Sequence, residues 1–354
     1  MDRKRTIIIS FLSLLLLAGI GAGGYVWHKA WLEEQFLTVP PESPGQDIMF
    51  RVEPGQIFTT ISANLKKNGL ITDTRRFLKL AQQTGKTSSL RAGQFKLSTG
   101  WTPDQILHEL SSSAGIMKKA SIREGLTWWQ TADKIQAAQL GSYKNFAEAI
   151  VDPELLKKYG LEAKNAEGYL FPETYLLTPP RGDQSRYMAE IMLKEFFKNA
   201  AKVWPEGLPE FEEMNKMVTL ASLIEKETGN TSERKRISGV FHNRLKKRML
   251  IQADPTIIYG LGPAFDGNIR RSHILDKKNP YNTYVIRGLP PGPICSPGLD
   301  ALLAAVHPED HSFLYFVAKG DGSHYFSKSL SEHNNAVRQY QLRRNRKTYR
   351  STQE

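Results

Sequence analysis

An uncharged apolar run near the N-terminus is the feature that most constrains this chain. The run covers residues 7–27 and follows three basic residues at positions 3–5. Its length matches the roughly 20 residues that a helix needs to cross a bilayer. Because the basic cluster comes first, the positive-inside rule predicts a cytoplasmic N-terminus. We therefore expect a cytoplasmic tail at 1–6, a single-pass anchor at 7–27 in the cell (inner) membrane, and everything after it outside the cytoplasm.

A cleaved signal peptide is the alternative interpretation of the same run. Small residues are frequent from Ala18 to Gly24, as they are near signal cleavage sites. The anchor is favoured because the run is long and ends in Tyr25-Val26-Trp27, an aromatic pattern typical of a membrane interface. N-terminal sequencing of the mature protein separates the two, since cleavage would give a start after residue 20.

Composition and charge limit the classes of partner. The chain has 354 residues, 40% apolar and 24% charged, which indicates a folded protein with more than one domain. The net charge of +12 favours an anionic partner. For an exported chain, this means a membrane surface or an acidic cell-wall polymer rather than nucleic acid. The single cysteine, Cys295, has no partner for an internal disulfide, and we expect it to be a small buried residue.

A weak repeat marks the start of the folded part, after a linker predicted at 28–47 from its Pro and Gly residues. Val52–Gln56 and Ile122–Thr127 each read as a strand and a tight Gly turn that lead into a helix. This pattern resembles the LysM glycan-binding module, and an unrelated small α/β unit is the alternative. Short strands between amphipathic helices predict a mixed α+β fold.

A helix predicted at 213–228 carries two carboxylates at its end. By the 3.6-residue period, Glu225 lies at one margin of the apolar face, and Glu227 lies near the other margin. A carboxylate at the edge of an apolar surface tends to have a raised pKa, so it can act as the general acid that glycosidic cleavage requires. Periodicity does not choose between the two acids, and a helix that merely ends in charged residues is the commoner case.

Polar and aromatic segments follow this helix and are typical of the loops that line sugar clefts. They cover residues 252–260, 279–284 and 288–293, and a similar aromatic segment, 167–175, precedes the helix. The candidate substrate-binding residues are Asn243, Gln252, Asp254, Tyr259, Asn282, Tyr284 and Glu173, and each of them is equally suited to stabilising a loop. The segment His307–His311 lacks a zinc-ligand spacing, so we expect no metal and no cofactor.

Five ordered motifs together resemble the endolytic murein (peptidoglycan) transglycosylase family of YceG-like proteins. They are residues 167–175, 221–228, 254–260, 281–284 and 288–292. The resemblance implies a membrane-anchored lytic transglycosylase, a peptidoglycan lyase, which cuts nascent glycan strands between N-acetylmuramic acid and N-acetylglucosamine. It also implies cooperation with peptidoglycan synthases. The first acid of the Ile-Glu-Lys-Glu element is the catalytic one in that family, and it maps onto Glu225.

The implied reaction uses one carboxyl group twice. Glu225 would protonate the glycosidic oxygen and then, as a carboxylate, take the proton of the muramic acid C6 hydroxyl, which closes a 1,6-anhydro ring. Glu227 is then a solvated or structural carboxylate. A non-catalytic glycan-binding protein and a water-using muramidase are the alternatives.

These expectations define a domain plan. The LysM-like domain is predicted at 48–113, an intermediate region at 114–205, the catalytic domain at 206–340 and a basic tail at 341–354.

Overall fold

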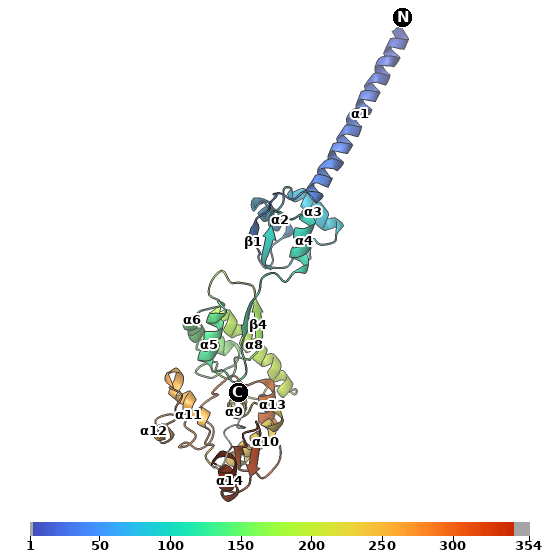
Figure 1. Ribbon diagram of the computed structural model, residues 1–354. Coiled ribbons are helices and arrows are strands. Elements are labelled where there is room, and N and C mark those ends of the chain that lie inside the picture. The colour runs from blue at the N-terminus through green and yellow to red at the C-terminus, as the bar shows by residue number, and fades with distance from the viewer. Residues whose placement is uncertain (1–2, 343–354) are drawn as a thin grey trace. The chain divides into compact units, whose positions relative to one another are not determined.

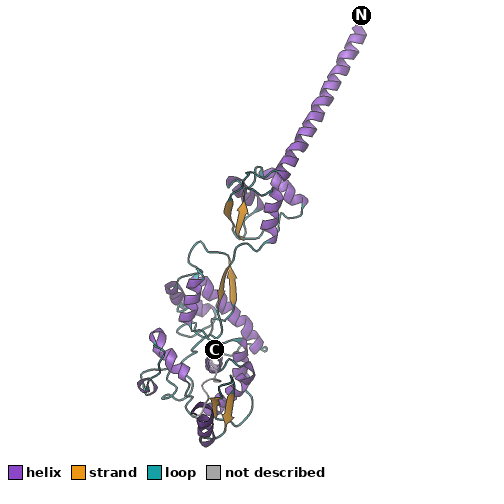
Figure 2. Ribbon diagram, in the orientation of Figure 1, coloured by secondary structure: helices purple, strands orange, loops and turns teal. Residues whose placement is uncertain are grey.

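The protein consists of two compact units, which cover Met1–Met117 and Lys118–Glu354 (Figure 1). This computed structural model describes residues 3–342, except for the side chains of residues 3–11, 13 and 342. Helices predominate, and three two-stranded antiparallel sheets complete the described residues (Figure 2). The predicted mixed α+β class is therefore confirmed. The predicted basic tail lies almost entirely outside the described residues.

The first helix, α1 (Arg3–Thr38), is longer than the sequence suggests. It continues through residues 30–38, where we expected a linker without helical period, and that expectation was wrong. Lys29, Leu32 and Glu33 favour helix, and the break comes only at Pro40. Among the residues that the structure describes, no helix is both long and apolar enough to cross a membrane. The predicted anchor at 7–27 falls partly on residues whose side chains are not described.

The rest of the N-terminal unit folds around one antiparallel strand pair. Strand β1 (Asp47–Val52) pairs with β2 (Gly93–Ser98), and between them in sequence lie α2 (Phe58–Lys67) and α3 (Thr74–Gln83). Helix α4 (Pro103–Ser112) follows and closes the core. The strand, the Gly turn and the following helix predicted around Val52–Gln56 are thus confirmed.

The C-terminal unit begins with a similar segment, in which helices lie between two paired strands. Strand β3 (Lys118–Ser121) leads to α5 (Trp128–Ala137), α6 (Tyr143–Ala149) and α7 (Pro153–Lys158), and then β4 (Thr174–Leu177) pairs with β3. This order repeats that of the N-terminal unit with one additional short helix.

The N-terminal and C-terminal units share the geometry of the Gly turn that follows their first strand. Gly55 and Gly125 both adopt a φ of 76°, a left-handed conformation that favours glycine, and a helix begins three residues after each. The weak repeat seen in the sequence is therefore a repeat of local structure.

Helices form the centre of the C-terminal unit. They are α8 (Ser185–Val203), α9 (Phe211–Glu227), α10 (Arg234–Lys246) and α13 (Leu299–Val306), and the 3₁₀ turn η1 (Thr231–Glu233) lies between α9 and α10. Helix α9 packs against α10 and α13 and buries its apolar face, including Val218, Leu220 and Leu223. The predicted helix with two carboxylates thus ends inside the unit, which places those carboxylates among side chains from several elements.

Smaller elements complete the described part of the C-terminal unit. They are α11 (Asp254–Leu261), the 3₁₀ turn η2 (Gly262–Ala264), α12 (Arg271–Ile274), the hairpin β5 (Tyr315–Ala318) and β6 (His324–Ser327), α14 (Leu330–Val337) and a π-helical turn (Arg338–Leu342). We expected a loop at residues 252–260, and this was wrong for α11. Pro255 lies in the first turn, where proline is tolerated in a helix.

Candidate active site

Glu225 is enclosed by protein groups at the end of α9. Its Oε1 accepts a hydrogen bond from Nη2 of Arg234 at 2.8 Å, and its Oε2 accepts one from the amide of Gly298 at 3.0 Å. The side chains of Glu225 and Arg234 are only 6% and 5% exposed. Burial raises the pKa of Glu225, while the Gly298 amide and the Arg234 charge oppose that rise. Both oxygens of this carboxylate are therefore engaged, one in a buried ion pair and the other by a backbone amide.

The ion pair belongs to a larger cluster. Arg234 also contacts Glu124 at 3.3 Å and Asp300 at 3.9 Å. Next to Glu225, Nζ of Lys226 donates to the carbonyl of Gly125 at 3.2 Å. These contacts join α9 and α10 to the Gly turn before α5 and to the first turn of α13. The geometry on this side indicates a structural junction.

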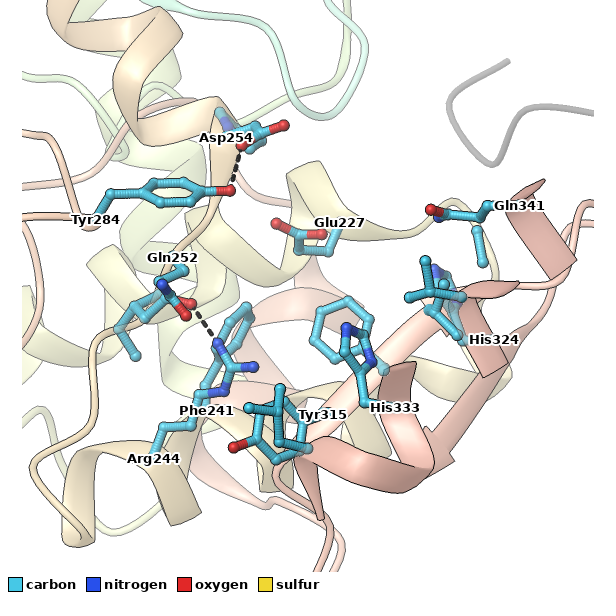
Figure 3. Close-up of a pocket in the computed structure, with 17 residues that line it drawn as sticks. Glu227, Phe241, Arg244, Gln252, Asp254, Tyr284, Tyr315, His324, His333 and Gln341 are labelled. Carbon is cyan, nitrogen blue, oxygen red and sulfur yellow. Dashed lines mark hydrogen bonds between the residues drawn. The ribbon is translucent and has the colours of Figure 1, made fainter. Parts of the chain in front are cut away.

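Glu227 instead faces a cavity of about 450 Å³ (Figure 3). The cavity is bounded by α9, α10, α11, the β5–β6 hairpin, α14 and the π-helical turn. Its other lining residues are Phe241, Arg244, Ile251, Gln252, Asp254, Pro255, Tyr284, Tyr315, Phe316, Val317, Ala318, His324, Leu330, His333, Val337 and Gln341. Figure 3 shows Glu227 between Asp254 and Tyr284 on one side and the aromatic rings of the hairpin on the other.

The surroundings of Glu227 suit a proton donor. Burial raises the pKa of this carboxyl group to about 7, the charge of Asp254 adds to the rise, and Arg244 opposes it. Within residues 3–342, no protein group is hydrogen-bonded to its carboxylate. A carboxyl group that is partly protonated near neutral pH and has a free oxygen can give its proton to a bound substrate.

Arg244 is held in place beside this carboxyl. Its Nε donates to the carbonyl of Leu314 at 2.7 Å, and its Nη1 donates to the carbonyl of Ile251 at 2.6 Å. The guanidinium lies over the ring of Tyr315, 5.2 Å from the centroid. A fixed cation here limits how far the pKa of Glu227 can rise.

Three of the predicted substrate-binding residues line the cavity. The hydroxyl of Tyr284 donates to Oδ1 of Asp254 at 2.6 Å, which orients that carboxylate. Gln252 lies beside them in a left-handed backbone conformation with a φ of 55°, and its amide donates to the carbonyl of Thr283 at 3.1 Å. The structure therefore brings Gln252, Asp254 and Tyr284 together with Glu227.

Two other predicted residues hold loops. Nδ2 of Asn243 donates to the carbonyls of His311 and Phe313 at 2.7 and 3.1 Å. The buried Asn282 donates to three carbonyls between residues 273 and 276. Both fit the loop-stabilising alternative stated above, and neither lines the cavity.

The last two predicted residues lie elsewhere. Glu173 is exposed at the start of β4, where its carboxylate accepts from the amide of Thr174. Tyr259 lines a second cavity. Cys295 is buried, as predicted, and its thiol donates to the carbonyl of Ser222 at 3.3 Å.

The sequence gives no indication that several other residues line this cavity. His324 is held by Glu233, whose Oε2 lies 2.8 Å from its Nδ1 and whose Oε1 accepts from its amide. Arg244, Tyr315 and His333 come from three different elements. No shared motif connects these residues, so only their convergence on one cavity reveals them.

Comparisons with known proteins agree with the five motifs. The YceG-like family model matches residues 50–339. A protein of Bacillus subtilis (strain 168) named endolytic murein transglycosylase is 31% identical over 344 residues, which cover 92% of each chain. A protein of the same name from Streptococcus pneumoniae serotype 2 is 28% identical, over 95% of this chain and 65% of its own length.

A solved structure extends the agreement to the fold. The crystal structure of a YceG-like protein from Listeria monocytogenes is 32% identical, with a TM-score of 0.54, over 82% of this chain and 99% of that one. The family resemblance inferred from the five motifs is thus confirmed, and this chain belongs to the YceG-like family.

Proposed function

We propose that this chain is an endolytic lytic transglycosylase that cleaves peptidoglycan glycan strands, and that Glu227 is its general acid. One observation carries the choice of residue: Glu227 is the carboxyl group whose pKa is raised to about 7 inside the 450 Å³ cavity. The names of the curated relatives support peptidoglycan as the substrate.

The reaction follows from one carboxyl group acting twice. Protonated Glu227 donates its proton to the glycosidic oxygen between N-acetylmuramic acid and N-acetylglucosamine, and that bond breaks. The resulting carboxylate then takes the proton of the muramic acid C6 hydroxyl as its oxygen bonds to the anomeric carbon. The products are a 1,6-anhydro end and a new hydroxyl end, and no water is consumed. The negative charge of Asp254 favours the oxocarbenium-like transition state.

Glu225 remains the residue that the family resemblance predicts, so the two acids need a direct test. Glu225→Gln and Glu227→Gln are matched, because each replaces one carboxyl by an isosteric amide. We expect Glu227→Gln to abolish 1,6-anhydro ends, detected by mass spectrometry of digested glycan strands, while Glu225→Gln retains them whenever the protein is folded. Full activity in Glu227→Gln would contradict the proposal and return the role to Glu225.

A water-using muramidase is the second candidate, and the proximity of two carboxylates favours it. Asp254 and Glu227 line one cavity, and a second carboxylate can activate a water molecule. The same mass spectrum separates the reactions, since hydrolysis leaves reducing ends in place of anhydro ends. Neither product from the wild-type protein would support the non-catalytic glycan-binding alternative.

The setting of the reaction is also proposed. Along α1, Leu14, Leu17 and Trp27 are 66–70% exposed, as expected of a helix whose apolar side chains face lipid. This supports the single-pass anchor at 7–27 with the enzyme outside the cytoplasm, close to peptidoglycan synthases. Protease treatment of spheroplasts tests it: the chain should remain with the membrane and be digested from outside.

The N-terminal unit is proposed as a LysM-like glycan-binding domain. Its strand, Gly55 turn and helix α2 support this assignment. Removal of residues 48–113 should weaken retention of the protein on purified cell walls without changing the product. Unchanged retention would favour the unrelated α/β alternative.

A further inference from the structure

A second cavity, of about 270 Å³, adjoins the one that holds Glu227. Pro255 lines both cavities. Two successive residues at the end of α9 line different cavities: Lys226 lines the second cavity, and Glu227 lines the first. The other walls come from the start of α5, from α11 and the turn after it, and from Ile294.

The lining of this second cavity suits a sugar ring. Trp129, Tyr259 and Phe265 are all partly exposed there. The rings of Trp129 and Tyr259 pack with their centroids 5.1 Å apart at an interplanar angle of 31°. Aromatic rings offer a flat apolar surface to the C–H faces of a sugar, and a few polar groups then set its orientation.

Polar donors are present beside these rings. Nζ of Lys226 gives one proton to the carbonyl of Gly125, and an ammonium group has three. The side-chain oxygen of Gln130 accepts from the amide of Thr127, which leaves its NH₂ group to donate. Hydroxyl and acetamide oxygens of an amino sugar are acceptors for such groups.

One buried carboxyl group holds the aromatic walls together. Oε2 of Glu167 accepts from the amide of Trp128 at 3.0 Å, and the same carboxyl interacts electrostatically with Tyr259. Glu167 thus links the start of α5 to α11. Burial raises its pKa to about 8, so it is largely protonated at neutral pH. Buried interactions within the fold therefore hold the walls of this cavity in place.

The internal repeat points to a specialised role for this wall. Counted from the equivalent glycines Gly55 and Gly125, the position of Trp129 corresponds to Thr59 in the N-terminal unit. The aromatic side chain is therefore a property of the copy that borders the cavity and is not required by the strand–turn–helix pattern.

We propose that the second cavity is a subsite for an N-acetylated amino sugar of the same glycan strand whose scissile bond lies at Glu227. The inference rests on the proposed function, because it states where the strand continues. An enzyme that cuts within a strand must hold sugars on both sides of the bond, and the shared Pro255 places this cavity next to the reaction.

The test uses the full chain in detergent, labelled with 5-fluorotryptophan and carrying Glu227→Gln. The protein has six tryptophans, and Trp129→Phe identifies the Trp129 signal in the ¹⁹F NMR spectrum. Titration with tetra-N-acetylchitotetraose should shift that signal saturably. Phe265→Ala should raise the Kd at least threefold, whereas Tyr187→Ala, at a half-exposed aromatic residue on α8, should leave it unchanged.

Two outcomes would overturn the subsite. One is a Trp129 signal that does not move at saturating sugar, and the other is an unchanged Kd in Phe265→Ala. The proposed reaction is judged separately, by the products of the unsubstituted chain. Absence of anhydro ends together with a shifting Trp129 signal would reject the reaction and keep the sugar site. On long strands, Phe265→Ala in the active chain should raise KM with little change in kcat.

Discussion

The two carboxylates at the end of α9 are two residues apart, yet their surroundings are opposite in kind. Both carboxylate oxygens of Glu225 accept hydrogen bonds, from Arg234 and from the Gly298 amide. Glu227 instead faces a cavity, and its pKa is raised to about 7. Burial alone does not make a carboxyl group a proton donor. A buried carboxylate with both oxygens engaged is costly to unpair, and one with a free oxygen is available for chemistry.

The largest expected effect is on catalysis. Glu227→Gln should lower kcat by about 10²–10⁴-fold, the usual contribution of a general acid. Glu225→Gln should act on stability first, with a much smaller loss of kcat in the folded fraction. The measurement is the rate of anhydro-end formation by protein whose folding is verified by circular dichroism. Equal losses of kcat in the two folded variants would contradict the different roles proposed for Glu225 and Glu227.

The next effect concerns the stability of the ion pair. Arg234→Met removes the partner of a buried carboxylate and should lower the free energy of unfolding by about 3–5 kcal/mol. Adding Glu225→Gln should restore part of that loss, because no buried unpaired carboxylate then remains. Urea unfolding of the single and double variants measures both. If the double variant were no more stable than Arg234→Met, the pair would not be the unit of stabilisation inferred above.

The pH dependence of activity is the third distinction. A general acid must be protonated, so kcat should fall as the pH rises through about 7, the pKa of Glu227. Asp254→Asn removes a negative charge that raises this pKa, so the midpoint of the fall should move to lower pH. Rates measured between pH 5 and 9 test both statements. A midpoint that stays in place in Asp254→Asn would mean that another group controls the profile.

The smallest effect is on the pH dependence of stability. The folded state holds a proton on Glu227 up to about pH 7, whereas an unfolded glutamate releases it near its ordinary pKa of 4.5. This contribution to stability is complete below about pH 4.5 and is lost as the pH rises to about 7. Glu227→Gln lacks that loss, so its stability relative to wild type should increase over this window by up to about 3 kcal/mol. A pH-independent difference would argue against a raised pKa.

Local patterns predicted the regular elements well. The apolar spacing of Ile61 and Leu65 is that of a helix, as α2 shows, and Thr102-Pro103 is a typical helix start, as at α4. Helix α11 was missed because Asp254, Pro255 and Thr256 are residues common in loops, although Asp and Pro are also favourable in a first helical turn. Composition alone does not separate these two uses.

Motif order was enough to identify the family, and helical periodicity was enough to put Glu225 and Glu227 at opposite margins of one face. Those signals are local, since they depend on spacing along the chain. The surroundings of each acid depend on groups far away in sequence: Gly298 caps Glu225, and the β5–β6 hairpin and α14 enclose Glu227. A pKa and a free oxygen arise from such long-range packing, so the contrast between the surroundings of the two carboxyl groups required the folded chain.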